Sequence, residues 1–171
     1  MSEQNPVSQL SLTTAPPPKR ASFYDTTAHK VADKTNQVAI PKALKRIIDE
    51  SQEGHLLLLQ YVGEAFLRLY TKMTFDNKML EIQENQKYSK KERDAIVEYL
   101  SSAAQVIEPD SQGRFVLPKE FADSLQQKEV VFLGSFEFIK IWPAELLQKT
   151  KKSGEQLLGA AVEDIRGVLG N

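Results

Sequence analysis

The chain has 171 residues, 41% of them hydrophobic, which suits one well-buried core better than two domains of ordinary size. It has no cysteine and only two histidines, His29 and His55, so disulfides and thiolate metal sites are excluded and a zinc site is disfavoured. No metal or other cofactor is therefore expected. A formal net charge of −1 argues against coating nucleic acid by overall charge, so any DNA binding must come from a local patch.

The first 22 residues are rich in Ser, Thr, Gln and Pro, and we expect residues 1–22 to form a flexible N-terminal arm. Lys19 and Arg20 could contact DNA phosphates, although a solvated leader is the simpler interpretation. The segment lacks the basic start and apolar stretch of a secretory signal, and no apolar run approaches the ~20 residues of a membrane helix. These features predict a cytoplasmic protein without a membrane partner.

An internal repeat is the most informative feature of the sequence. Residues 33–42 match residues 110–119 in a pattern of Asp, turn, apolar residues and Pro-Lys, and residues 66–70 match residues 138–142. We therefore expect a first repeat over residues 23–85. A linking helix and the second repeat are expected over residues 86–147, and a C-terminal helix over residues 148–171.

Each repeat is predicted to run strand, tight turn, strand, helix, strand, turn, strand. Pro41 and Pro118 are placed to open the helices. The predicted hairpins pair residues 55–61 with 65–70, and residues 130–133 with 137–142 across a turn at 134–136. Asp76, Glu81 and Glu84 are interpreted as lying in a polar connector, where carboxylates usually serve solubility.

Two further helices are predicted from capping boxes followed by apolar stripes. Ser89 and Glu92 cap the linking helix, and a second box, Ser153 to Gln156, lies in the expected C-terminal helix. The apolar face of the C-terminal helix fits both packing on its own barrel and pairing with a neighbouring subunit, and we favour the second.

The turn Asp110 to Arg114 has a recognisable physical logic. Gly113 allows a left-handed backbone that tightens the chain, which brings Asp110 and Arg114 close together. In the first repeat Asn36 takes the place of this glycine, and asparagine tolerates the same backbone region. Gln37, however, stands in the place of the arginine and offers only neutral hydrogen bonds.

Residues 93–142 resemble the second half of the MraZ family of transcriptional regulators, through Val106, Asp110, the turn Gln112-Gly113-Arg114, Leu117-Pro118, residues 129–134 and Ile141-Trp142. The resemblance implies a β-rich α+β fold, a double-split β-barrel of the AbrB type made from two tandem repeats. It also implies a ring-like homo-oligomer in the cytoplasm, associated with the nucleoid, that binds repeated DNA boxes upstream of a cell-division and cell-wall gene cluster. The DNA-binding residues would be Arg114, Gln112, Ser111, Lys34, Asn36 and Gln37, and the turns would be held by Asp33, Asp110 and Gly113.

Three alternatives stay open. Asp110 and Arg114 could form an ion pair that only holds the turn, with no DNA nearby. Because Gln37 replaces an arginine and the net charge is close to zero, a ring that has lost specific DNA binding and serves as a protein scaffold is the second alternative. An enzyme is the third and is not expected, because no nucleophile elbow, phosphate loop or paired-histidine motif is present.

Overall fold

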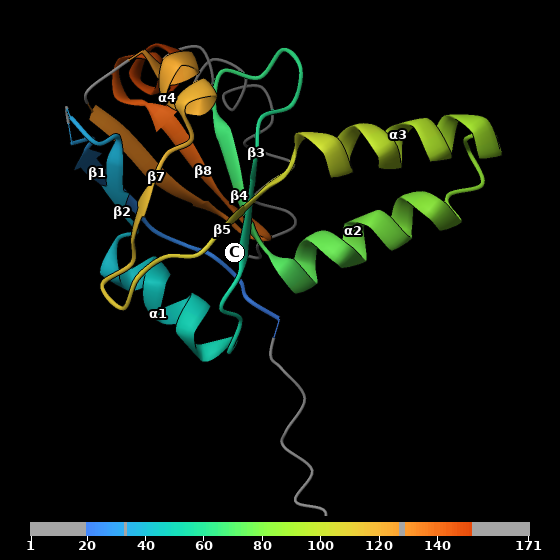
Figure 1. Cartoon of the computed structure of the whole chain (residues 1–171), viewed down its shortest axis with the longest axis horizontal. Coiled ribbons are helices and arrows are strands. Elements are labelled where there is room, and N and C mark those ends of the chain that lie inside the picture. Colours follow the sequence, from blue (N-terminus) through green and yellow to red (C-terminus); the bar gives the residue numbers. More distant parts are fainter. Residues whose placement is uncertain (1–19, 33, 127–128, 152–171) are drawn as a thin grey trace, which may run out of the picture.

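The computed structural model describes residues 20–32, 34–126 and 129–151 of the chain. Eight strands and four complete helices follow one another, and a further helical segment covers residues 144–151 (Figure 1). In chain order they are β1 (Thr26–Lys30), β2 (Gln37–Ala39), α1 (Lys42–Glu50), β3 (Leu56–Leu59), β4 (Leu67–Thr71), α2 (Lys72–Glu84), α3 (Lys90–Ala103), β5 (Gln105–Ile107), β6 (Arg114–Val116), α4 (Lys119–Leu125), β7 (Glu129–Ser135) and β8 (Phe138–Pro143). The predicted β-rich α+β class is confirmed.

The strands form one six-stranded sheet and one two-stranded sheet, and all the pairs are antiparallel. The larger sheet has the order β1-β7-β8-β4-β3-β5, and the smaller one pairs β2 with β6. Exchanging β1 with β5, β3 with β7 and β4 with β8 reverses the order of the larger sheet and leaves it otherwise unchanged. The element order β-β-α-β-β also occurs twice along the described residues, in β1 to β4 with α1 and in β5 to β8 with α4.

The main core lies between the two sheets and helices α1 and α4. It contains buried apolar side chains from both halves, among them Val38 and Phe115 from the small sheet and Phe132 and Ile141 from the large one. A second, smaller cluster covers the part of the opposite face formed by β3 and β4, where α2 and α3 pack as a helical hairpin (Figure 1). On this second face the side chains of β7 and β8 are only partly buried.

Helices α1 and α4 begin where the sequence predicts. Pro41 and Pro118 are their N-cap residues, with nearly identical backbone angles of φ −53° and −52° and ψ 141° and 143°. Proline fixes φ and lacks the N–H that would be unpaired at a helix start. The capping box of Ser89 and Glu92 at the start of α3 is likewise confirmed.

The interpretation of the segment around Asp76, Glu81 and Glu84 as a polar connector is wrong, because all three residues lie in α2. Thr71 caps the helix by accepting a hydrogen bond from the backbone N–H of Thr74 at 3.3 Å. The apolar face of α2 is narrow. Phe75 belongs to the second core cluster, and Met79 and Ile82 pack against that cluster. With so few apolar residues among polar ones, the helical period was too weak to detect in the sequence.

The predicted turn at residues 134–136 is also corrected. The pairing of β7 with β8 continues through Gly134 and Ser135, and the chain reverses at Phe136, whose φ is +60°. Gly134 is needed for a different reason, since a Cβ atom there would lie 2.7 Å from the backbone of Phe23 and Tyr24. Glycine here permits a close backbone approach and not a turn.

The expected N-terminal arm and the expected C-terminal helix lie partly outside the described residues. This applies to residues 1–19 of the arm and to residues 152–171, which include the second capping box. Within the expected arm, Ala21 is buried and Arg20 forms an ion pair with Glu137, so the packed part of the chain includes Arg20 to Ser22. Among the described helices, none is long and apolar enough to cross a lipid bilayer.

Candidate nucleic-acid interface

The turn that precedes β6 is closed by hydrogen bonds around one carboxylate. Asp110 Oδ1 accepts from the backbone N–H groups of Gln112 and Arg114, both at 2.9 Å. The backbone N–H of Gly113 donates to the carbonyl oxygen of Asp110 at 2.8 Å, and Gly113 has a φ of +78°. These bonds close the turn around the Asp110 carboxylate and the backbone of Gly113.

The side chains of Asp110 and Arg114 form an ion pair at the surface. Arg114 Nε donates to Asp110 Oδ2 at 2.7 Å, and the arginine side chain is 47% exposed. The backbone N–H of Arg114, and then its guanidinium, lower the pKa of the Asp110 carboxyl below its usual range. This bond to Asp110 uses only the Nε atom and orients the guanidinium. The two terminal nitrogens of Arg114 have no partner among the described residues.

The turn that precedes β2 has a related shape, with Gln37 in the place of Arg114. Asn36 has a φ of +51°, so it takes the left-handed conformation predicted for it. The backbone N–H of Ala32 donates to the carbonyl oxygen of Gln37 at 2.9 Å, the same bond that Asp110 makes with Arg114. This turn is thus one residue longer than the second, and Asp33, its predicted anchor, lies outside the described residues.

The two turns are tied to each other through the small sheet. The backbone N–H of Ile40 donates to the carbonyl oxygen of Gly113 at 2.9 Å, and that of Leu117 donates to the carbonyl oxygen of Asn36 at 2.9 Å. Between these bonds, β2 and β6 pair with Val38 opposite Phe115. The result is a short two-stranded ribbon with one turn at each end.

The outward face of this ribbon carries four side chains. Because side chains alternate along a strand, burial of Val38 and Phe115 turns their neighbours outward. The pairing sets Gln37 opposite Val116 and Ala39 opposite Arg114. The sequence predicted Gln37 and Arg114 as site residues but missed Ala39 and Val116, which the alternation of each strand would have placed on the same face.

Basic residues flank the ribbon, and several of them are engaged in their own helix. Lys45 pairs with Asp49 at 2.6 Å, and Arg46 pairs with Glu50 at 3.8 Å. Exposed basic or polar side chains remain at both turns and both helix starts, namely those of Lys34, Lys42, Ser111, Gln112 and Lys119. Such side chains suit contacts to phosphates, which position a protein on DNA without reading its sequence.

A shallow groove of about 420 Å³ runs between the ribbon and the edge strand β5. It is lined by Gln37, Val106, Ile107, Glu108, Asp110, Arg114, Phe115 and Val116. Its two carboxylates are both paired, Asp110 with Arg114 and Glu108 with His55 Nδ1 at 3.0 Å. The groove therefore combines exposed apolar side chains with two carboxylates that already have partners.

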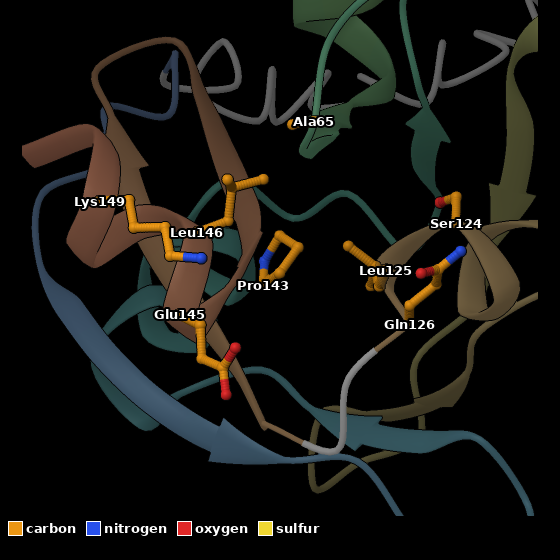
Figure 2. A pocket seen from close by; sticks show the side chains of 8 residues that line it. All are labelled: Ala65, Ser124, Leu125, Gln126, Pro143, Glu145, Leu146 and Lys149. Atoms are coloured by element: carbon orange, nitrogen blue, oxygen red, sulfur yellow. The ribbon is translucent and has the colours of Figure 1, made fainter.

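A second pocket, of about 290 Å³, lies between the end of α4 and the helical segment that follows β8 (Figure 2). Its polar lining includes Ser124, Gln126, Glu145 and Lys149. The hydroxyl of Ser124 donates to the carbonyl oxygen of Phe121 at 2.8 Å, a bond within its own helix. No histidine lines this pocket, so it does not assemble a serine nucleophile with a histidine base.

Comparison with known proteins shows which family the chain is similar to. Residues 100–157 match the family model described as "MraZ protein, putative antitoxin-like", a stretch that includes the second turn. The chain is 26% identical over 135 residues to the transcriptional regulator MraZ of Bacteroides thetaiotaomicron, covering 78% of this chain and 86% of the relative. It is 27% identical over 118 residues to that of Flavobacterium psychrophilum (68% and 74%), and 25% identical over 140 residues to that of Phocaeicola vulgatus (81% and 90%). The resemblance inferred from the sequence is confirmed.

Proposed function

This chain is a relative of the MraZ transcriptional regulators, and we propose that it is itself a sequence-specific DNA-binding regulator that contacts DNA through the β2–β6 ribbon and its two turns. The observation that carries the proposal is the position of Arg114. Its guanidinium is held by Asp110 at one nitrogen only, on the exposed face of the ribbon.

The size of the ribbon supports this role. The major groove of B-DNA is about 12 Å wide and admits a two-stranded β-ribbon. Gln37 and Arg114 stand diagonally on one face of β2 and β6, a relation that separates Cα atoms by roughly 7–8 Å. Both side chains can therefore reach base edges in one groove at the same time.

The two turns supply the remaining contacts in this proposal. Gln112, Ser111 and Arg114 in the second turn, and Lys34, Asn36 and Gln37 in the first, surround the ribbon at its two ends. An arginine donates two hydrogen bonds to guanine O6 and N7, and lysine neutralises phosphates. Ser111 and Lys34 are exposed, as contacts to DNA require.

We further propose that the two halves are tandem repeats forming a double-split β-barrel, and that several copies assemble into a ring. The reversible order of the large sheet and the reciprocal bonds of the small one support the repeat. A ring would present many ribbons to repeated promoter boxes of a cell-division and cell-wall gene cluster, and multivalency would compensate for weak single contacts. Removing residues 153–171 and measuring the mass in solution tests whether they hold the ring together: an unchanged mass contradicts that role.

The main test is a fluorescence-anisotropy titration of the purified protein against DNA from upstream of its own gene, with scrambled DNA for comparison. We expect preferential binding to the natural DNA, with an affinity that falls as salt rises. Arg114→Ala should weaken specific binding about tenfold or more, since a good bidentate base contact contributes about 1–3 kcal/mol.

Arg46→Ala is the matched control. It removes an exposed arginine of α1 whose side chain pairs with Glu50 and is not one of the four outward side chains of the ribbon. We expect it to weaken binding to natural and scrambled DNA alike, if at all. Equal loss of specificity in both variants, or equal affinity of the wild-type protein for both DNAs, would contradict the proposal.

One observation favours the alternative of a protein scaffold. Gln37 removes a charge from one end of the ribbon, and the groove beside the ribbon exposes Val106 and Val116, 61% and 56% exposed. In that case the assembly would be indifferent to DNA. The same titration separates the two functions, because a scaffold predicts no difference between natural and scrambled DNA.

A further inference from the structure

The outward face of the ribbon holds an exposed valine directly opposite Gln37. Val116 is 56% exposed, although the strand that carries it is buried on its other face by Phe115. Single exposed apolar residues are common on protein surfaces. Val116 differs from these because it shares one face with Gln37, Ala39 and Arg114 and borders the groove beside them.

We propose that Gln37 and Val116 act together to recognise an A·T base pair, with Gln37 bonding adenine and Val116 contacting the thymine methyl group. This inference rests on the proposed function and names the bases that the ribbon reads. In the major groove adenine presents N7 and an amino group, which match a glutamine amide, and thymine presents a methyl group, which matches an apolar side chain. Directly opposed residues have Cβ atoms about 4.5–5.5 Å apart, so the two side chains face neighbouring groups of one or two base pairs.

The geometry of the pair favours this assignment. No described residue bonds the Gln37 side chain, so both its amide donor and its acceptor are available. Valine is branched at Cβ and has little rotamer freedom, so ordering its side chain against a base costs little entropy. Replacement of arginine by glutamine at the first turn then changes the base that is recognised instead of abolishing recognition.

The second pair on the ribbon gives the contrast. Ala39 stands opposite Arg114, and arginine bonds guanine O6 and N7. The two ends of the ribbon would therefore read different bases, A·T near Gln37 and G·C near Arg114. The binding site predicted for one ribbon is asymmetric, even though the ribbon is built from two similar strands.

The test uses a DNA duplex enriched by the wild-type protein from a random library, in which single thymines are replaced by uracil, which lacks only the methyl group. We expect one such replacement to weaken wild-type binding about fourfold, the effect of removing one buried methyl-sized group. In Val116→Ala the same replacement should have no effect, because the apolar contact is already lost. In Gln37→Ala the preference for adenine at the paired base should disappear while the preference for guanine persists.

Val106→Ala is the matched control, since Val106 is a similarly exposed valine in the same groove but on β5. This variant should keep the full effect of uracil. An equal effect in wild type and Val116→Ala, no effect of uracil at any position, or loss of the effect in Val106→Ala would overturn the inference while leaving specific binding intact. Failure to enrich any sequence would overturn the proposed function, and this inference with it.

Discussion

The backbone N–H of Ile40 donates to the carbonyl oxygen of Gly113 at 2.9 Å, which joins the end of the first ribbon strand to the turn before the second. Leu117 makes the reciprocal bond to Asn36 at the other end of the ribbon. Each turn is therefore held by the strand of the opposite half, and neither half can form its candidate contact surface alone. Changes in either turn should affect the whole ribbon.

Gly113→Ala should weaken DNA binding and stability together. Gly113 has a φ of +78°, and an added Cβ would lie 3.0 Å from Lys45 Cδ and 3.4 Å from the carbonyl oxygen of Ile40. The left-handed conformation alone costs an ordinary residue about 1–2 kcal/mol, which chemical unfolding would measure. Loss of the turn shape should also displace Arg114 and lower DNA affinity in the anisotropy titration.

Gly63→Ala provides the control for backbone strain. Gly63 has a φ of +83°, but nothing lies within 4 Å of an added Cβ, and it sits in the turn between β3 and β4. We expect a similar loss of stability with unchanged DNA affinity. If Gly113→Ala binds DNA as tightly as Gly63→Ala does, the second turn does not position a DNA contact.

Asp110→Asn should destabilise the protein near neutral pH and have little effect in acid. The bonds from the backbone and guanidinium of Arg114 lower the pKa of Asp110 in the folded state. A lowered folded pKa means that the carboxylate stabilises the fold above the ordinary aspartate pKa, about pH 4, and that this stabilisation is lost as pH falls through the folded value. The melting temperatures of variant and wild type should therefore converge as the pH falls below about 4.

Glu92→Gln is the matched control for this pH dependence. The hydroxyl and backbone N–H of Ser89 lower the pKa of Glu92, which lies in the capping box of α3 and, like Asp110, is exposed. The same convergence in acid is expected, but only Asp110→Asn should change the affinity for DNA. A constant difference in melting temperature across the whole pH range would contradict the role given to the Asp110 carboxylate.

The local features of the ribbon were predictable from sequence, and its assembly was not. The second turn is predictable because the residue types at Asp110, Gly113 and Arg114 each have a specific local role. The two helix starts are predictable from Pro41 and Pro118. The pairing of β2 with β6 depends on contacts between distant parts of the chain, so no local pattern predicts its register. Val116 was missed for this reason, since its place beside Gln37 exists only once the strands pair.

Gly134→Ala should destabilise the edge of the large sheet. The added Cβ would lie 2.7 Å from the backbone carbon of Phe23 and from the backbone nitrogen of Tyr24, and backbone atoms cannot move aside as a flexible side chain can. The bond from Gly134 N–H to the carbonyl oxygen of Asp25, at 2.8 Å, would be strained as well. Overpacking of this kind costs about 1–3 kcal/mol, measurable by urea unfolding.

Gly54→Ala is the comparison for this variant, because nothing lies within 4 Å of a Cβ at that position. It should change stability much less. DNA affinity at a temperature where both variants are folded should match the wild type, since Gly134 lies in β7, outside the ribbon. Wild-type stability in Gly134→Ala would contradict the close packing of the Phe23 and Tyr24 backbone against Gly134.

Gln37→Arg should make DNA binding tighter, more salt-dependent and different in base preference. The variant places a second guanidinium on the ribbon face, diagonally opposite Arg114. One more cationic contact should steepen the dependence of log affinity on log salt by about one per ribbon. Because arginine bonds guanine, the preference near this end should shift from A·T to G·C in sequences enriched from a random library.

Gln86→Arg, which adds the same charge at an exposed position between α2 and α3, should leave the base preference unchanged. If both variants tighten binding equally and neither alters the preferred sequence, Gln37 lies outside the DNA interface and only overall charge has been measured.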